Sequence, residues 1–336
     1  MKKTNLFMLI VPVFFVAMIV FVASCTKEGQ QGPQGESGVQ TCGQCHNFSE
    51  DVLARQIQYE ASGHLNGGTF ERNGTDCAPC HTSMGYREVL QTGEQETSAA
   101  ISNPTPVNCF TCHNIHETYT SSDWQLRSTT PVAFWINDVV SDQGTANVCI
   151  SCHQPRIPDP FPSPGTREDI TITSPYWGPH HGPQGTMIAG TGGYEVGGGY
   201  SNSAHSNIEN TCVKCHMAEA YGNQAGGHTW NMTYLYHGGD HLNIAGCTDC
   251  HTDPDALEAM VEGTVEVIDG LLADLRTVLL TQGVLDSSDH VIPGTMSMDQ
   301  AGGVFNYLFV LEDRSEGLHN TKYAKKLMEN SIESLQ

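Results

Sequence analysis

The sequence predicts a mostly α-helical chain with extensive irregular loops, in which covalently bound groups replace much of an ordinary side-chain core. Two observations predict this fold class. The pattern Cys-x-x-Cys-His occurs six times and uses twelve of the 13 cysteines. The chain also contains 35 Gly and 16 Pro, and much of its hydrophobic content lies near the N-terminus. Composition alone would therefore leave the rest of the chain with a marginal core.

Each motif places two thiols one helical turn apart and follows them directly with a histidine, which is the attachment signature of c-type haem. The thiols form thioethers to the porphyrin, and the histidine binds the iron as its proximal ligand. A zinc site could explain one such motif but not six in one chain. The cysteines expected to attach haem are Cys42, Cys45, Cys77, Cys80, Cys109, Cys112, Cys149, Cys152, Cys212, Cys215, Cys247 and Cys250. The histidines expected beneath the irons are His46, His81, His113, His153, His216 and His251. The motifs therefore predict a hexahaem c-type cytochrome, wrapped around six covalent haem c groups and without disulfides.

The N-terminus has the pattern of a signal peptide over residues 1–24. Two lysines precede an apolar run over residues 6–22. At about 17 residues this run could just span a bilayer, so a retained anchor helix is the alternative. Residues 22–25 resemble a bacterial lipobox, in which Cys25 is lipidated and becomes the new N-terminus. The sequence thus predicts an exported lipoprotein that faces the periplasm or the cell surface, and Thr26 in place of aspartate favours the outer membrane over the inner.

The remaining chain divides into three parts by composition. Residues 25–40 form a glycine-rich tether, and residues 41–252 form the hexahaem domain, with a short hairpin expected near residues 191–200. The motifs are unevenly spaced, which argues against a solenoid. Residues 253–336 contain no cysteine and form a C-terminal helical segment expected to pack on the haem domain. Apolar spacing and capping residues predict helices over 255–280, 299–313 and 320–335.

The strongly acidic composition excludes one class of partner. The formal net charge is −22, with only 15 Lys and Arg. Nucleic-acid binding needs clustered basic side chains, so the sequence predicts no such partner. A solvated acidic surface keeps an exported protein soluble, and it could also steer the chain toward basic redox partners.

The chain has 16 histidines, and the ten outside the motifs exceed ordinary surface use. Two histidines on one iron close it to substrate, which is an electron-transfer arrangement. His116 follows His113 by three residues, so it should serve a neighbouring haem, and His64 should serve a haem near the first motif. Only one of the adjacent His180 and His181 is expected to reach an iron. The predicted distal ligands are His64, His116, His180, His181, His205, His228 and His319.

Three other histidines are less suited to iron ligation. His237 and His241 could bind zinc together on one helix face. The two glycines between them disfavour a helix, so one of the pair is a reserve haem ligand. His290 is expected at the surface.

Short segments around the predicted distal histidines resemble a known superfamily. Residues 60–64, 200–205 and 317–320 are similar to distal-histidine segments of the multihaem superfamily that contains the pentahaem nitrite reductases and the octahaem oxidoreductases. The resemblance implies closely packed haems that act as a wire. The nitrite reductases carry one haem with lysine in place of the motif histidine, and this chain has no such motif. The reductase active site is therefore not carried over, and no catalytic residue is assigned.

Three functional hypotheses follow. In the first, the chain relays electrons through closely packed bis-histidine haems in an anaerobic-type respiratory chain, tethered to the membrane by its lipid. Its partners would be other cytochromes or quinol-linked donors of the membrane. In the second, one open haem reduces a small nitrogen or sulfur compound such as nitrite or hydroxylamine, which the surplus of histidines disfavours. In the third, the chain is a subunit of an oligomer or extracellular cytochrome filament.

Overall fold

The computed structural model describes His46 and residues 50–336. The predicted signal peptide, the tether, the lipidation site and both cysteines of the first motif lie outside the described residues. The chain divides into two compact units, residues 1–47 and 48–336, and the description below concerns the second unit.

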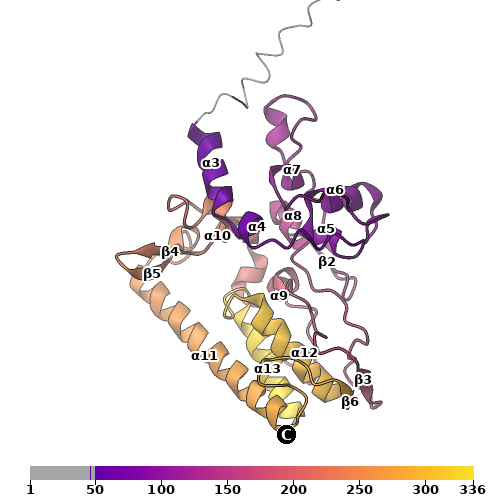
Figure 1. Cartoon of the computed structure of the whole chain (residues 1–336). Helices are drawn as coiled ribbons and strands as arrows, with labels where there is room; N and C mark the ends of the chain where they lie inside the picture. Colours follow the sequence, from indigo (N-terminus) through magenta and orange to yellow (C-terminus); the bar gives the residue numbers. More distant parts are fainter. Residues whose placement is uncertain (1–45, 47–49) are drawn as a thin grey trace, which may run out of the picture. The chain divides into compact units, whose positions relative to one another are not determined.

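The structure confirms the predicted fold class, because the chain is mostly helical with few short strands and long irregular loops (Figure 1). Many of the helices before the C-terminal segment are only one or two turns long. The α-helices of this region are α3 (Glu50–Glu60), α4 (Gly63–Asn66), α5 (Ala78–His81), α6 (Ser83–Thr92), α7 (Cys109–Cys112), α8 (Asn147–Ile150), α9 (Gln184–Ala189) and α10 (Thr211–His216). Single 3-10 turns are η1 (Ser121–Trp124), η2 (Gly144–Ala146), η3 (Ala204–Asn207), η4 (Gly227–Thr229) and η5 (Ile244–Gly246).

The strands of the described chain form three two-stranded antiparallel sheets. The pairs are β1 (Val132–Ala133) with β2 (Val140–Ser141), β3 (Ile170–Ile172) with β6 (Gly294–Met296), and β4 (Thr233–Tyr236) with β5 (Gly239–Leu242). The prediction of a hairpin near residues 191–200 is wrong, because those residues form bends and irregular loop without strands. The tight hairpin is β4–β5, which turns at His237 and Gly238 with φ of +49° and +85°. Two successive residues with positive φ are what a two-residue hairpin turn requires.

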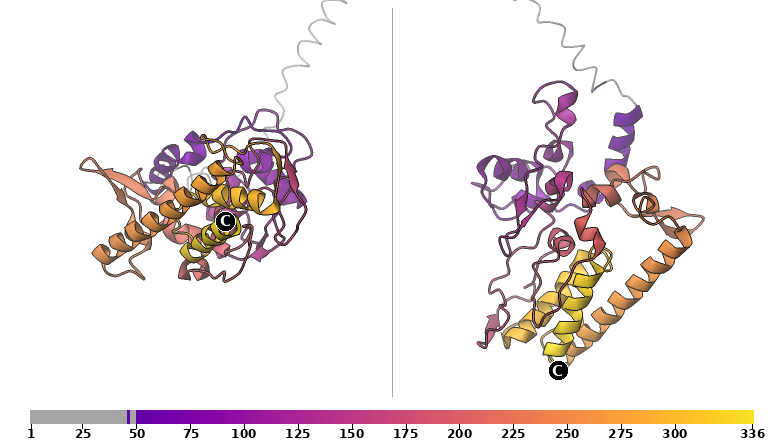
Figure 2. Two further views of the ribbon diagram at one scale, coloured as in Figure 1. Left: turned by 90° about the horizontal axis from the view of Figure 1, so that it is seen from below. Right: turned by 180° about the vertical axis from the view of Figure 1, so that it is seen from behind.

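The C-terminal segment consists of three long helices that pack against one another in pairs (Figures 1 and 2). They are α11 (Pro254–Thr281), α12 (Met298–Asp313) and α13 (Thr321–Ser334). Asp253 caps α11 ahead of a proline at the first helical position, and Ser297 and Gln300 form a capping box at α12. Among the residues that the structure describes, no helix is both long and apolar enough to cross a membrane.

The hydrophobic core lies in the second half of the chain. Its buried cluster runs from Phe134 to Met328 and centres on α12, where Phe305 and Phe309 are fully buried. Of the described residues before position 132, only Ala78 and Tyr86 are buried hydrophobic residues. The segment that carries the second and third motifs therefore has almost no side-chain core of its own.

One buried amide joins a loop of the haem-motif region to the C-terminal helices. Asn306 on α12 accepts the backbone N–H of Tyr194 at 2.7 Å and donates to the Tyr194 carbonyl at 2.8 Å and to Ser331 Oγ at 2.9 Å. Its side chain is fully buried. These bonds satisfy both backbone groups of Tyr194 where water cannot reach them.

We expect Asn306→Ala to destabilise the haem-loaded protein by about 2 kcal/mol, because it leaves the buried N–H of Tyr194 without an acceptor and removes one of the two donors to the Tyr194 carbonyl, which keeps the N–H of Val196. Chemical denaturation followed by circular dichroism measures the change. The exposed Glu333 on α13 provides the control, since Glu333→Ala should stay within about 0.5 kcal/mol of the wild type. Equal stability of the two variants would contradict the assigned role.

Candidate haem-binding sites

Each of the five described motifs forms a single helical turn that brings its three functional side chains together. In four of them the N–H of the motif histidine donates to the carbonyl of the first cysteine: His81 to Cys77 at 3.1 Å, and His113 to Cys109, His153 to Cys149 and His251 to Cys247 at 2.9 Å each. The fifth motif lies within α10 (Thr211–His216). Positions i, i+3 and i+4 of a helical turn share one face. Both thiols and the imidazole of a motif can therefore reach one flat ligand.

In the second to sixth motifs, the ring of the motif histidine is paired with the ring of a histidine from elsewhere in the chain. The ring centres are 6.2 Å apart for His81–His180, 6.3 Å for His113–His228, 6.2 Å for His153–His64, 6.2 Å for His216–His319 and 6.4 Å for His251–His205. All five partner histidines are among the distal ligands expected from the sequence. The structure thus brings five predicted distal histidines to the five described motifs.

This spacing fits one metal ion between two imidazoles. A metal–imidazole bond is about 2.0 Å long, so two such bonds with the ring radii place the ring centres about 6 Å apart. The interplanar angles vary from 33° to 83°, which rotation about the shared axis allows without changing the separation. Ordinary aromatic contacts spread over roughly 4.5–7 Å, whereas these five pairs fall within 6.2–6.4 Å. The residues present therefore fit a bis-histidine haem at each described motif.

Hydrogen bonds at Nδ1 orient many of these rings. The contacts from Nδ1 are His81 to Thr69 Oγ1 at 2.7 Å, His113 to the Trp124 carbonyl at 2.6 Å, His153 to Gln184 Oε1 at 3.1 Å, His216 to the Trp230 carbonyl at 2.8 Å, His205 to the Leu318 carbonyl at 2.7 Å and His319 to Asp313 Oδ1 at 2.7 Å. A carbonyl or carboxylate oxygen only accepts, so the proton of such a ring resides on Nδ1. The other nitrogen, Nε2, is then free to bind iron. Four of the five pairs contain a ring held in this way; in the remaining pair, His81 contacts the Thr69 hydroxyl, which can either donate or accept.

Burial favours the neutral, metal-binding form of several partner histidines. Burial, together with the charge of neighbouring histidines, lowers the pKa of His64, His180 and His228 to about 4. Neutral imidazole is the form that binds metals. His319 differs, because burial lowers its pKa but the charge and hydrogen bond of Asp313 outweigh burial and leave the pKa raised.

Thiols of different motifs lie in contact with one another. The Cys80 thiol of the second motif is hydrogen-bonded to the Cys152 thiol of the fourth, and the Cys149 thiol of the fourth motif is hydrogen-bonded to the Cys212 thiol of the fifth. Each contact, together with burial, raises the pKa of Cys152 or Cys149 well above its usual range. The fourth motif thus lies between the second and the fifth. None of the ten described cysteines forms a disulfide.

Two further predicted ligands lie elsewhere. His181 is beside His180, with ring centres 4.9 Å apart, and its Nδ1 is 3.0 Å from Glu312 Oε2 on a side chain that is 66% exposed. His116 donates its backbone N–H to Asp123 Oδ2 at 2.8 Å, and its ring stacks near Tyr119. His181 and His116 are not among the partners of the five described motif histidines, so their ligation stays a prediction.

The histidines that the sequence left in reserve also lie apart from these pairs. His237 and His241 belong to the β4–β5 hairpin and contact Tyr236, and His290 is a surface residue near Asp286. Within the described part of the chain, no group of three or more His, Cys, Asp or Glu side chains could hold a metal ion without a porphyrin.

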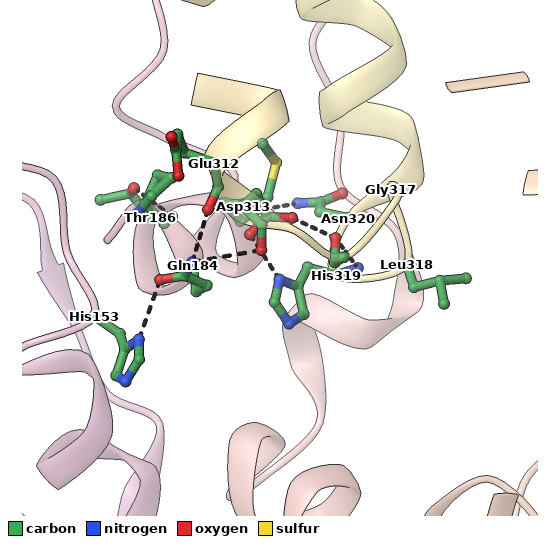
Figure 3. Close-up of polar contacts among 12 residues, drawn as sticks. His153, Gln184, Thr186, Glu312, Asp313, Gly317, Leu318, His319 and Asn320 are labelled. Carbon is green, nitrogen blue, oxygen red and sulfur yellow. Dashed lines mark hydrogen bonds and ion pairs between the residues drawn. The ribbon is translucent and has the colours of Figure 1, made fainter. Parts of the chain in front are cut away.

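Sequence reasoning missed two residues that hold the predicted ligands in place (Figure 3). Gln184 accepts from His153 and donates from Nε2 to the Glu312 carbonyl at 2.9 Å, which connects the fourth motif to the end of α12. Asp313 accepts from His319. Gln184 lies far from its partners in the sequence, and Asp313 is one of many acidic residues. No local sequence pattern therefore identifies either residue as a partner of an axial histidine.

These motifs and paired histidines are features of cytochromes with covalent haem, and the fold is similar to that of a solved cytochrome. The chain is similar to the crystal structure of the outer cell wall cytochrome OcwA, with a TM-score of 0.54 and 21% sequence identity over 83% of this chain. The match covers 50% of that cytochrome, so this chain spans about half of its length. The sequence matches no protein-family model, and no curated protein matches it significantly.

Proposed function

We propose that the chain is an exported hexahaem c-type cytochrome that transfers electrons between redox partners. The observation that carries this proposal is the set of five histidine pairs with ring centres 6.2–6.4 Å apart, each built on a Cys-x-x-Cys-His turn. When bound, haem supplies the reversible one-electron couple of its iron. The chain supplies the thioether attachment, both axial ligands and the hydrogen bonds that orient them.

The contacts between thiols of different motifs support closely packed haems. Cys80 and Cys152 belong to different motifs and touch, as do Cys149 and Cys212. Porphyrins attached at touching thiols have adjacent edges, and electron tunnelling is fast only over short edge-to-edge distances. We therefore infer a relay in which the fourth motif passes electrons between the second and the fifth.

The pairing disfavours the reductase alternative. An enzyme that reduces nitrite or hydroxylamine at iron needs an axial position that its own side chains leave open. In the second to sixth motifs, a second histidine lies where it could bind the other side of the iron. A reductase would therefore need its open iron at the first motif. Electron transfer is the function that the described sites support.

The proposed location follows from the N-terminal sequence. Residues 1–24 would be removed and Cys25 lipidated, which anchors the chain to a membrane, with the outer membrane favoured by Thr26. Its partners would be other cytochromes or quinol-linked donors of the membrane. The net charge of −22 would guide it toward basic patches on those partners.

Two measurements on the mature protein test the proposal. We expect its mass to include six haems and a lipid on Cys25. Low-temperature electron paramagnetic resonance of the oxidised protein should show low-spin, bis-histidine iron at the five described motifs or more. Fewer haems, or high-spin signals from more than one iron, would refute the electron carrier, and a Soret shift on addition of nitrite would favour the reductase.

A further inference from the structure

One of the histidine pairs is held by a buried carboxylate (Figure 3). His319 Nδ1 lies 2.7 Å from Asp313 Oδ1, and the Asp313 side chain is 2% exposed. The His319 ring is also the partner of His216 in the fifth motif, at 6.2 Å between ring centres. The carboxylate therefore contacts a predicted axial ligand directly.

The loop after α12 fixes this carboxylate in place. Asp313 is the last residue of α12, and Arg314 ends the helix with φ of +57°. Ser315 Oγ donates to Asp313 Oδ2 and accepts the backbone N–H of His319 at 3.2 Å. Among the ion pairs of the described residues, Asp313 occurs only with His319, while Arg314 is paired with Glu312. A buried carboxylate needs a charged or hydrogen-bonding partner, and here the imidazole is that partner.

The other rings described above contact neutral groups through Nδ1. Their Nδ1 partners are the Thr69 hydroxyl, the Gln184 amide and the carbonyls of Trp124, Trp230 and Leu318. His181 contacts the carboxylate of Glu312, but it is exposed and is not the partner of a described motif histidine. The carboxylate contact therefore distinguishes the fifth site from the other described sites.

A carboxylate acceptor changes what its imidazole does to a metal. By attracting the Nδ1 proton it increases the electron density at Nε2, which makes the ring a more basic ligand. A more basic ligand and a nearby negative charge both stabilise ferric iron over ferrous iron. In a buried position the charge is weakly screened by solvent, so its influence on the iron is large.

We propose that Asp313 is a tuning residue that gives the fifth motif the lowest reduction potential of the five described sites. The inference rests on the proposed function, since it requires haem at that motif with His216 and His319 as ligands. The Cys149–Cys212 contact joins the fourth and fifth motifs. The haem of the fifth motif would therefore be a low-potential neighbour of the haem at the fourth motif, which is the centre of the relay.

Asp313→Asn tests the inference, because it removes the charge and retains an oxygen that can accept from Nδ1. In a spectroelectrochemical titration of the haem-loaded protein, we expect the lowest midpoint potential to rise and the others to stay within error. The matched control is Glu316→Gln, which removes an exposed carboxylate from the same loop and should leave every potential unchanged. Unchanged potentials in Asp313→Asn, or a shift in a haem other than the lowest, would overturn the inference.

Ser315→Ala gives a second test with the opposite sign, and it applies even if Asp313→Asn does not fold. Removing the hydroxyl that donates to Asp313 Oδ2 leaves more negative charge to act on His319, so the lowest potential should fall further. A rise or no change would contradict the proposal. The low-spin resonance signals distinguish failure of the proposed function from failure of the role of Asp313. Their absence from the wild type refutes the proposed function. Their presence, with midpoint potentials that do not change in the variants, refutes only the role of Asp313.

Discussion

Replacing His180 by alanine is expected to convert one low-spin iron of the protein to a high-spin, open iron, whereas replacing its neighbour His181 is not. The His180 ring lies 6.2 Å from the ring of His81 in the second motif, and the His181 side chain is 66% exposed and contacts Glu312. Loss of His180 removes the second axial ligand, and an iron with one histidine binds external ligands. Electron paramagnetic resonance and the Soret shift of the reduced protein with carbon monoxide measure the change.

The adjacent histidines supply their own controls. His181→Ala should retain the wild-type spectrum, and the double variant should match His180→Ala if His181 does not move in to replace the lost ligand. A high-spin signal in His181→Ala together with a normal spectrum in His180→Ala would reverse the assignment of the pair.

A chain produced in a host that lacks haem-attachment machinery is expected to lose the structure of residues 50–131 while retaining α11 to α13. Ordering a backbone costs about 1–2 kcal/mol of conformational entropy per residue. Residues 50–131 contain only two buried hydrophobic residues, so hydrophobic burial cannot offset this entropy. The C-terminal helices share the hydrophobic core with Phe305 and Phe309 at its centre. Hydrogen exchange measured peptide by peptide should show near-complete loss of protection before position 132 and persistent protection over residues 298–334.

The haem-loaded protein, measured in parallel, should be protected in both regions. Protection of residues 50–131 in the haem-free chain would mean that this segment folds on side-chain contacts that the structure does not show. Loss of protection in both regions would mean that the C-terminal helices also depend on the cofactors.

Local patterns were sufficient to predict the C-terminal helices. Apolar spacing with Asp253 and Pro254 at the start predicted a helix over 255–280, and α11 extends over Pro254–Thr281. The information lies within the segment itself, in its periodicity and caps. The fold class was predictable for a similar reason, because repeated attachment motifs and abundant glycine imply short helices and loops around large ligands.

The expected hairpin near residues 191–200 shows how local patterns mislead. Its paired glycines resemble turn residues between two strands. In the structure this loop packs on α12 and α13 instead, where Asn306 and Asn330 bond to the backbone of Tyr194 and Val196. Tertiary hydrogen bonds took the place of strand pairing, and no property of the loop itself indicates that outcome.

The partners of the motif histidines could not be predicted from spacing. The ring of His64, for example, is paired with that of His153 in the fourth motif, far along the chain. Which histidine meets which motif depends on the course of loops without periodicity. Spacing also could not choose between His180 and His181: the His180 ring lies 6.2 Å from that of His81, whereas His181 contacts Glu312.

The thiol contacts between motifs also constrain how the protein is made. Cys80 touches Cys152 and Cys149 touches Cys212 in the folded chain, so two cross-links would form if these residues met as free thiols in an oxidising compartment. A thiol consumed in that way cannot form a thioether. If these thiols carry haem, as proposed, attachment has to precede tertiary folding. Residues 50–131, which contain only two buried hydrophobic residues, would then stay accessible until haem is bound. In that case the thiol contacts of the folded chain determine the order of attachment and folding.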